Sequence, residues 1–415
     1  MISPIRTSSI LKAIALGSLT GILLHYWQLS GSIIDDICLA GSDMFMHLIK
    51  MLVVPVVFVS LVSGVSSLKN MGALGRMGIR TLCYYLATTA LAISLALIIA
   101  HFSGIGSQLN LSFHGEVSYA QAQNPLEVLI DIIPTNPFKA MVEGHMLQII
   151  FFAIIFSAAI NTTKHQENVM AAFNKANDIL MNLVMLCMKT APLGVFFLLA
   201  KAFSQAGFEA MTHMLSYMAV VLCALLIHLL GVYSILLKGI ARLSPITFFK
   251  KIANCMLFAF SVSSSSASLP LVLKTVREKC GVSNEVASFV IPLGATVNMD
   301  GTAIMQGAAT VFVANAYGVD IGLMGYLSII SMATLASIGT AGVPGVGLIM
   351  LSMVLSQLGL PIDGPALAMI FGVDRLLDMC RTAVNISGDA VVTCCIATHE
   401  KAIDRSTWHS EAASS

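Results

Sequence analysis

Residues 250–279 read KKIANCMLFAFSVSSSSASLPLVLKTVREK, and this stretch decides how the chain folds. Two lysines precede its uncharged core, residues 252–273, and three basic residues follow it (Lys274, Arg277 and Lys279). In a membrane protein, short loops rich in Lys and Arg stay on the cytoplasmic side, so both ends are expected there. The 22 uncharged residues suffice for one crossing but not for two. The pattern predicts a re-entrant hairpin turning at SVSSSSASLP; a flexible serine linker is the alternative.

The composition places the whole chain in a membrane. Of its 415 residues, 57% are hydrophobic and only 10% are charged, whereas soluble domains carry about 25% charged residues. We therefore expect an integral membrane protein with several spans and with the lipid bilayer as its main solvent. No basic cluster points to a nucleic-acid partner. The nine cysteines are interpreted as apolar packing residues, because they lack zinc-ligand spacing.

Apolar stretches long enough to cross a bilayer predict eight transmembrane helices. The candidate spans are residues 10–29, 43–66, 79–103, 126–160, 176–203, 211–237, 286–317 and 366–398. Lys and Arg flank alternate ends of these spans, which predicts that both termini are cytoplasmic. The first stretch has a signal-like basic flank, but no convincing cleavage site follows, so we expect a retained first span.

A second uncharged segment, residues 321–362, repeats the pattern of the first. SASLP ends at Pro270 and TAGVP ends at Pro344, and an aspartate follows each proline by thirty positions (Asp300 and Asp374). The segment could form two spans or a second hairpin that enters from outside. The echo favours the hairpin and indicates an inverted repeat, in which discontinuous elements at matching positions mark a transporter's binding site.

The last predicted span carries a narrow polar stripe. At about 100° per residue, one face of the helix gathers Asp374, Asp378, Arg381, Thr382, Asn385 and Asp389. Counting Arg375, five charged residues facing lipid would cost on the order of 15 kcal/mol, more than a typical domain's stability. The face must therefore line a wet or protein-lined interior, where ionisable residues mark functional sites. The alternative is a structural ladder of salt bridges.

The motif NMDGT, residues 298–302, places one carboxylate in an otherwise uncharged run from Val286 to Val319. It supplies a carboxylate, an amide, a hydroxyl and a glycine that we expect to let the helix unwind and expose carbonyls. A hard cation such as Na⁺ takes oxygen ligands of this kind, while Arg381 suits an organic carboxylate. A site for both a cation and an organic anion describes a coupled symporter.

Six motifs resemble those of the glutamate/aspartate:sodium symporter family (dicarboxylate/amino acid:cation symporters), which includes archaeal aspartate transporters and animal excitatory amino acid transporters. They are HLIKMLVVPVVF, DIIPTNPF, SSSSASLP, LGATVNMDGTA, ASIGTAGVPG and DRLLDMCRTAVNISGD, between about Met44 and Ala397. The resemblance implies a sodium-coupled secondary active symporter that imports aspartate or glutamate. It needs no organic cofactor and is not an enzyme.

The same resemblance implies an all-α polytopic fold with eight transmembrane helices and two re-entrant hairpins, arranged as inverted repeats. A homotrimeric scaffold would hold a mobile transport domain that carries substrate across as an elevator, with the second hairpin as the outer gate. The implied parts are a scaffold at about 1–70 and 125–205, a transport domain at about 76–105 and 210–400, hairpins at about 250–280 and 322–360, and a cytoplasmic tail at 401–415.

The resemblance also assigns substrate-binding residues. Asp378 would take the amino group of the substrate, and Arg381 its side-chain carboxylate. The remaining implied contacts are Ser264 and Ser265 at the first hairpin tip, Val343 and Gly347 in the second hairpin, Thr382 and Asn385 on the last span, and Thr302 as support.

Three sodium-binding groups follow from the same resemblance. The first comprises Gly294, Asn298, Asn385 and Asp389. The second uses the carbonyl oxygens of Thr296, Ser337, Ile338 and Thr340. The third comprises Tyr85, Thr88, Thr89, Asn298 and Asp300.

Some positions depart from the family pattern. Neither Ser263 nor Met379 is the arginine that archaeal and animal relatives carry at one or the other position, although Arg375 lies one turn before Met379. Met305 stands where an aromatic residue is common. Gln306 replaces the glutamate that is the expected proton carrier of animal relatives, so we expect no obligatory proton co-transport.

Other functions remain open from the sequence alone. A sodium- or proton-coupled symporter for C4-dicarboxylates would leave Asp378 without a role, and one for neutral amino acids would leave Arg381 without one. An anion channel would be secondary to an elevator mechanism. A serine hydrolase using Ser264 would need a general base, and neither histidine nor lysine is predicted near that tip.

Overall fold

The computed structural model describes residues 7–27, 33–66, 71–109, 111, 133–143, 145–206, 209–337, 345–362 and 364–410. Across these ranges the chain is helical and forms no strand beyond an isolated bridge between Val282 and Ile403. The described part is therefore all-α, as the sequence predicts.

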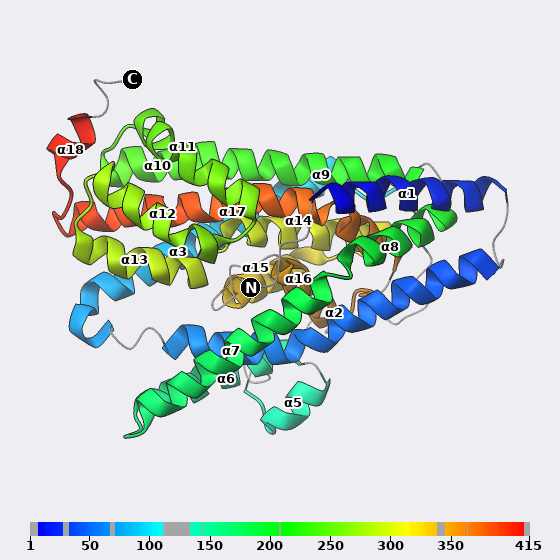
Figure 1. The fold of residues 1–415 in the computed structure, drawn as a ribbon, viewed down its shortest axis with the longest axis horizontal. Helices are drawn as coiled ribbons and strands as arrows, with labels where there is room; N and C mark the ends of the chain where they lie inside the picture. The colour runs from blue at the N-terminus through cyan, green and yellow to red at the C-terminus, as the bar shows by residue number, and fades with distance from the viewer. Residues whose placement is uncertain are drawn as a thin grey trace.

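The first half of the chain contains α1 (Thr7–Tyr26), α2 (Ile33–Ser66), α3 (Met71–Ser103), α5 (Pro137–Glu143), α6 (Met146–Asn161), α7 (Gln166–Met188) and α8 (Ala191–Ala206) (Figure 1). The second half begins with α9 (Glu209–Ile227), which continues through a π-helical turn η2 (His228–Val232), α10 (Tyr233–Leu236) and a second π-helical turn η3 (Leu237–Ala241). The remaining helices are α11 (Pro245–Val262), α12 (Ser265–Glu278), α13 (Asn284–Val297), α14 (Asp300–Ala316), α15 (Gly322–Ser337), α16 (Val346–Gln357), α17 (Pro365–His399) and α18 (Arg405–Ser410).

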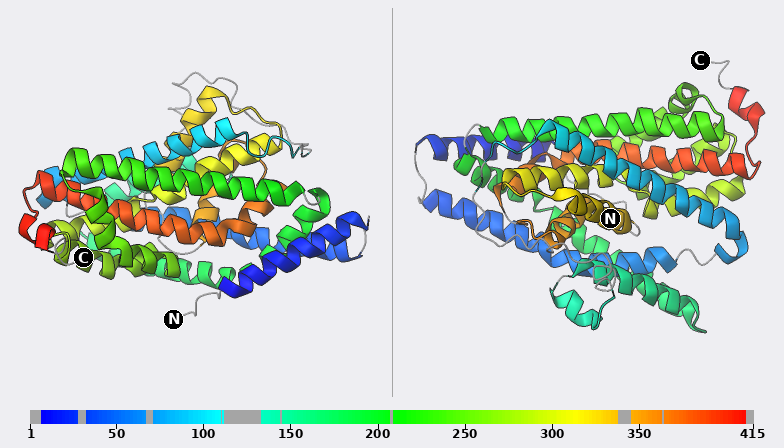
Figure 2. Two further views of the ribbon diagram at one scale, coloured as in Figure 1. Left: turned by 90° about the horizontal axis from the view of Figure 1, so that it is seen from above. Right: turned by 180° about the vertical axis from the view of Figure 1, so that it is seen from behind.

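The helices pack as two groups, which meet where α8 packs on α17 and α2 packs on α16. In the first group, α1 packs on α8, and α2 packs on α6, α7 and α8. In the second group, α17 runs along the bundle beside α9, α11, α12, α13 and α14, while α3 packs on α14 (Figure 2). Every residue of α17 from Arg381 to Ala397 is buried. A helix buried on all sides belongs to the core of a protein, so its polar stripe faces other helices.

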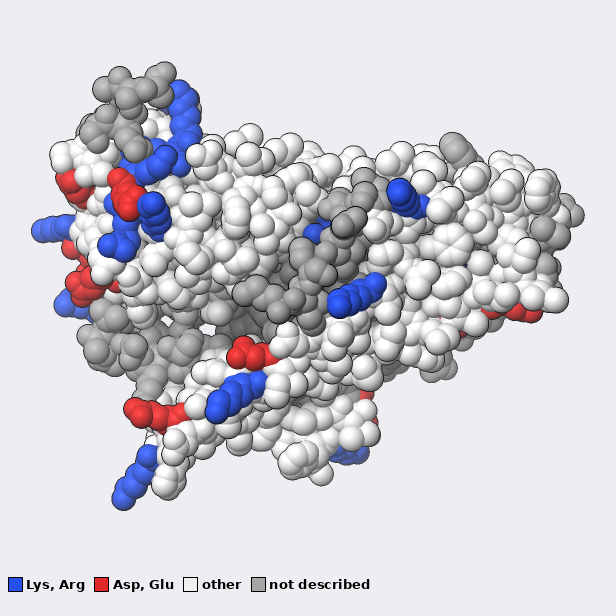
Figure 3. Space-filling view, viewed as in Figure 1, with Lys and Arg blue, Asp and Glu red and all other residues white. Residues whose placement is uncertain are grey.

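Three of the described helices are long and apolar enough to cross a membrane by length and composition: Arg76–Ser103, Met211–Ala241 and Pro245–Val262. Shorter apolar helices cover Phe151–Asn161, Ala191–Ser204, Gly322–Leu335 and Val346–Gln357. Charged residues gather at one end of the face seen in Figure 3, over α11, α12 and α18, while the middle of that face is largely uncharged.

Two predicted spans in the first half of the chain are not single helices. The span predicted at 176–203 combines the end of α7 with α8, because the helix breaks at Lys189 and Thr190. Pro192 follows in the first turn of α8, where its missing N–H costs no helical hydrogen bond. Within the span predicted at 126–160, the described residues form α5 and α6, with His145 between them.

The segment at 252–273 is a helical hairpin, and the linker alternative is wrong. α11 ends at Ser263, whose φ of 53° is left-handed, and Ser264 caps α12 by accepting a hydrogen bond from the N–H of Ala267. The two helices pack together. At the base of the hairpin, Lys251 Nζ donates to the backbone oxygen of Lys279. The turn thus lies within the predicted SVSSSSASLP motif.

The segment at 321–362 also contains two packed helices, α15 and α16. They have 16 and 12 residues, and each is shorter than the roughly 20 residues of one crossing. This favours the hairpin over two full spans. The TAGVP turn itself lies at 338–344, outside the described residues.

The end of the chain is folded onto the base of the first hairpin rather than extended as a tail. Ser283 N–H donates to Ala402 O (2.9 Å) and Asp404 N–H donates to Gly281 O (2.7 Å). Trp408 is only 3% exposed, and Lys251 Nζ lies 5.3 Å from the centre of its ring system. The predicted tail at 401–415 is therefore structured through residue 410.

Candidate functional site

The helix that carries NMDGT is interrupted just before Asp300. α13 ends at Val297, Asn298 has φ −92° and ψ 93°, and α14 begins at Asp300. We expected Gly301 to lie at the break, but it lies in the first turn of α14. A Cβ atom there would stand 2.6 Å from the backbone oxygen of Arg381. The glycine therefore allows α14 to approach α17 closely, and the unwinding falls on the two residues before Asp300.

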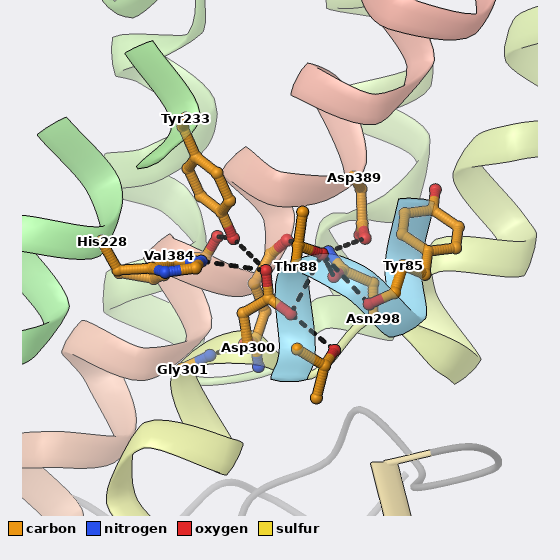
Figure 4. A network of polar contacts seen from close by, with 11 residues as sticks. Tyr85, Thr88, His228, Tyr233, Asn298, Asp300, Gly301, Val384 and Asp389 are labelled. Carbon is orange, nitrogen blue, oxygen red and sulfur yellow. Dashed lines mark hydrogen bonds and ion pairs between the residues drawn. The ribbon is translucent and has the colours of Figure 1, made fainter. Parts of the chain in front are cut away.

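Four side chains surround the carboxylate of Asp300, which is fully buried (Figure 4). Thr89 donates to Oδ1 at 2.7 Å, and Thr88 Oγ1 lies 3.4 Å from the same oxygen. On the other side, Tyr233 donates to Oδ2 at 2.8 Å and His228 Nε2 lies 3.1 Å from it. The predicted partners Thr88 and Thr89 are thus brought to Asp300.

His228 and Tyr233 were not predicted from the sequence. A histidine inside an uncharged apolar span is an intramembrane ionisable residue, and this signal could have identified His228. Tyr233 carries no comparable signal, because a tyrosine within an apolar helix is usually a packing residue.

Beside Asp300, several acceptor oxygens lie near the hydroxyl group of Thr88. Thr88 Oγ1 lies 3.4 Å from Asp300 Oδ1 and 3.5 Å from Asn298 Oδ1. Its nearest acceptor is the carbonyl oxygen of Tyr85, at 3.1 Å. Asn298 must present its oxygen here, because its Nδ2 donates to Asp389 Oδ1 at 2.9 Å. Among the described residues the donor nearest to Asn298 Oδ1 is therefore the Thr88 hydroxyl, at 3.5 Å. Carbonyl, amide and carboxylate oxygens grouped in this way are ligands of the kind a hard cation takes.

The second buried carboxylate, Asp389, lies beside Gly294 and Asn298. A Cβ atom on Gly294 would stand 2.4 Å from Asp389 Oδ1 and 2.5 Å from the hydroxyl oxygen of Tyr85. That hydroxyl donates to the carbonyl oxygen of Val290 at 2.9 Å. The side chain of Tyr85 therefore lies near the first predicted sodium group, while its backbone carbonyl faces Thr88 in the third.

Asn385 links these groups to the stripe on α17. Its Oδ1 accepts from the N–H of Gly301 at 2.7 Å, and its backbone oxygen accepts from Asn298 Nδ2 at 3.2 Å. Its Nδ2 lies 3.5 Å from Thr302 Oγ1. All three contacts are to the NMDGT segment, in which Thr302 is also a predicted substrate residue.

The second predicted sodium group is described only in part. Thr296 donates to Leu293 O at 2.9 Å and Ser337 donates to Thr334 O at 2.7 Å. Both hydroxyl protons are used within their own helices, which is consistent with a role through carbonyl oxygens. Ile338 and Thr340 lie outside the described residues.

Arg381 forms the centre of a charged cluster on α17 and is fully buried. Its Nη2 lies 2.8 Å from Asp378 Oδ1 and 2.9 Å from Asp374 Oδ1. Arg375 Nη1 lies 3.7 Å from the other oxygen of Asp378. In the described residues, Nε and Nη1 of Arg381 have no hydrogen-bond partner. Two donors of a buried guanidinium thus remain for a carboxylate ligand.

The second hairpin reaches this guanidinium. A Cβ atom on Gly347 would stand 3.3 Å from Arg381 Nη1, 3.2 Å from Thr302 Cγ2 and 3.3 Å from Met305 Cε. The glycine near the start of α16 therefore keeps space beside the unpaired donor. Thr382 donates to the backbone oxygen of Asp378 at 2.7 Å, one turn away.

The serines of the first hairpin occupy its turn. Ser264 is the N-terminal cap of α12 and Ser265 its first residue, and both are buried. α12 packs against α17. Val343, the other predicted contact from the second hairpin, lies outside the described residues.

Comparison with known proteins identifies the family of the chain. A family model described as the sodium:dicarboxylate symporter family matches residues 7–399. The chain is 32% identical over 410 residues to a proton/glutamate-aspartate symporter of Escherichia coli (strain K12), covering 95% of this chain and 93% of the relative. It is 33% identical over 360 residues to a proton/sodium-glutamate symport protein of Bacillus subtilis (strain 168), covering 84% and 83%.

A third relative is a C4-dicarboxylate transport protein of Rhodospirillum rubrum, 30% identical over 410 residues, with 95% of this chain and 88% of the relative covered. The family model covers residues 7–399, and the three relatives cover 84–95% of this chain. These findings make the chain a member of the sodium:dicarboxylate symporter family, and hence a cation-coupled membrane transporter rather than an enzyme.

Proposed function

We propose that this protein is a sodium-coupled symporter that imports an acidic amino acid, aspartate or glutamate, across the cell inner membrane. The observation that carries the proposal is the pairing of two sites on α14 and α17. Beside Asp300, the amide oxygen of Asn298 and the carbonyl oxygen of Tyr85 share the Thr88 hydroxyl with the buried carboxylate. On α17, the buried guanidinium of Arg381 has two nitrogen donors, Nε and Nη1, without a hydrogen-bond partner in the part of the chain that the structure describes.

Sodium is the ion that the site chemistry supports best. Asp300 and Asp389 are both buried, and in the described residues neither is paired with a lysine or arginine. The proposed sodium ligands are Tyr85, Thr88, Thr89, Gly294, Thr296, Asn298, Asp300, Ser337, Ile338, Thr340, Asn385 and Asp389. Two relatives are named for proton coupling, so the experiment below compares uptake with and without sodium at fixed pH.

An acidic amino acid matches the charges near Arg381. The side-chain carboxylate of the substrate would bind Nε and Nη1 of Arg381. Its ammonium group would bind Asp378, whose Oδ1 accepts a hydrogen bond from Arg381 Nη2 at 2.8 Å. Thr302, Thr382 and Asn385 would take the remaining polar groups. The proposed site is completed by Ser264, Ser265, Val343 and Gly347 from the two hairpins.

The proposed mechanism is an elevator within a homotrimer, with both termini cytoplasmic. Residues 1–70 and 125–205 would form the scaffold, and residues 76–105 and 210–400 the transport domain. The helix packing supports this division, since α2 packs on α6, α7 and α8 while α17 packs on α9 and α11–α14. The contacts of α8 with α17 and of α2 with α16 would then form the interface between scaffold and transport domain. The hairpins at about 250–280 and 322–360 would enter the membrane from opposite sides.

A C4-dicarboxylate symporter is the second candidate, because relatives with that name match 95% of the chain. A dicarboxylate would occupy the donors of Arg381 but would give Asp378 no ammonium to bind. The presence of Asp378 within 2.8 Å of Arg381 therefore favours the amino acid.

Uptake into proteoliposomes tests the proposal. Labelled aspartate, glutamate, serine and succinate are offered under an inward sodium gradient and under an equal choline gradient, at fixed pH. We expect sodium-dependent uptake of aspartate or glutamate and little of the other two. Succinate uptake alone would establish the second candidate, and equal uptake of aspartate in choline would exclude sodium coupling.

A further inference from the structure

His228 and Tyr233 approach the same oxygen of Asp300 from one side (Figure 4). Both side chains are fully buried, and their rings lie 4.6 Å apart at an interplanar angle of 72°. Tyr233 has one proton, and Asp300 Oδ2 at 2.8 Å is closer than Val384 O at 3.4 Å. The phenol therefore donates to the carboxylate.

The tautomer of His228 follows from its surroundings. Nε2 lies 3.1 Å from Asp300 Oδ2, whereas Nδ1 is buried without a hydrogen-bond partner among the described residues. A proton on Nε2 gives a hydrogen bond to the carboxylate. A proton on Nδ1 alone would direct a lone pair at Oδ2 and leave a buried donor unpaired. His228 thus acts as an Nε2–H donor.

The π-helical turn is what brings the two rings together. His228 and Tyr233 are five residues apart, and on an α-helix they would point about 140° away from each other. In η2 the N–H of Tyr233 instead bonds to the carbonyl oxygen of His228, which closes an i→i+5 turn. This turn brings the two rings together on one face in an edge-to-face arrangement, and π turns of this kind are frequent at functional sites.

The two donors hold only one side of the carboxylate. His228 and Tyr233 both contact Oδ2 of Asp300. The other oxygen, Oδ1, therefore faces the Thr88 hydroxyl, which also lies near Asn298 Oδ1. We infer that His228 and Tyr233 are positioning residues for the coupling cation: they fix the orientation of Asp300 Oδ1 and so set the affinity for sodium. This inference rests on the proposed sodium-coupled function.

The chain offers matched variants. Tyr233→Phe removes the donor and keeps the ring, while His228→Leu removes the donor and His228→Gln retains one. Tyr217→Phe is the control, because Tyr217 is another fully buried tyrosine of the same long helix and its hydroxyl has no hydrogen-bond partner among the described residues. The readout is the sodium concentration that half-maximally raises the melting temperature of the purified protein without substrate, with choline keeping ionic strength constant.

We expect Tyr233→Phe and His228→Leu each to raise that sodium concentration roughly tenfold, the effect of losing one hydrogen bond to a charged group. His228→Gln should recover most of the loss, and Tyr217→Phe should match the wild type. In an Asp300→Asn background, adding Tyr233→Phe should have no further effect, because the pair acts through Asp300.

Each other outcome decides against a specific statement. If Asp300→Asn lowers sodium affinity but Tyr233→Phe and His228→Leu do not, the positioning role is wrong and the proposed function stands. If both variants weaken sodium equally in the wild-type and Asp300→Asn backgrounds, their effect is general and the positioning role is also wrong. If Asp300→Asn leaves the sodium response unchanged, the sodium role of Asp300 fails and the inference fails with it.

Discussion

Replacing Arg381 by cysteine should convert the transporter from acidic to small neutral substrates. The guanidinium is fully buried, lies 2.8 and 2.9 Å from Asp378 and Asp374, and keeps two donors unpaired. Truncating one partner of a buried charge pair typically costs about 2–5 kcal/mol, or roughly 30- to 4,000-fold in affinity. Aspartate should lose affinity within this range, while serine, which has no side-chain carboxylate, should gain.

The assay is competition by aspartate and by serine against sodium-dependent stabilisation of the purified protein, followed by uptake in proteoliposomes. Arg375→Cys is the control: Arg375 lies on the same helix and contacts Asp378 only at 3.7 Å. It removes the same group from the same helix, and we expect a much smaller loss of aspartate affinity. Equal loss of aspartate and serine binding in a folded Arg381→Cys protein would show that Arg381 only neutralises its two aspartates.

Three further predictions concern the ion, the proton and the end of the chain. Asp300→Asn and Asp389→Asn should each raise the sodium concentration required for uptake at least roughly tenfold, measured as initial rates across a sodium series. Sodium-driven uptake should be nearly flat from mildly acidic to mildly basic pH because Gln306 cannot titrate, and substrate-driven alkalinisation outside the vesicles would contradict this. Hydrogen bonds from neighbouring hydroxyl and amide groups lower the pKa of Asp404 from 3.8 to about 2. The stability that these hydrogen bonds contribute is therefore present above about pH 4 and is lost as pH falls towards 2. In a variant whose other tryptophan is replaced by phenylalanine, Asp404→Ala should shift the fluorescence of Trp408 to the red at neutral pH.

The sequence predicted those parts of the fold that depend on a single feature, such as flanking charge or helical periodicity. The hairpin at 252–273 followed from basic residues at both ends, and the structure has its turn at Ser263 and Ser264. The stripe on α17 followed from 100° periodicity, because α17 is a regular helix. Apolar length alone could not locate the break at Lys189–Thr190, since the residues on both sides of it are equally apolar.

The missed contacts around Asp300 have a different cause. His228 and Tyr233 would not share a face of a regular helix, so no 3.6-residue pattern predicts that they meet. Only the π turn aligns them, and a local change of hydrogen-bond register leaves little trace in composition. The role of Gly301 was assigned incorrectly for a related reason: the sequence shows that a glycine is needed, but not which neighbouring backbone comes close.

The charge balance of the described site explains why cation and substrate would bind together. Asp374 and Asp378 are matched by Arg375 and Arg381, so this cluster is neutral as a whole. Asp300 and Asp389 are two further buried carboxylates, and their described partners are amide, hydroxyl, phenol and imidazole groups. An acidic amino acid adds one net negative charge beside them. Burying uncompensated charge is costly, so each cation bound near Asp300 or Asp389 lowers the cost of bringing in the substrate. Asn385, four residues after Arg381 on α17, contacts Asn298, Gly301 and Thr302, so the helix that carries the charged cluster also packs directly on the NMDGT segment.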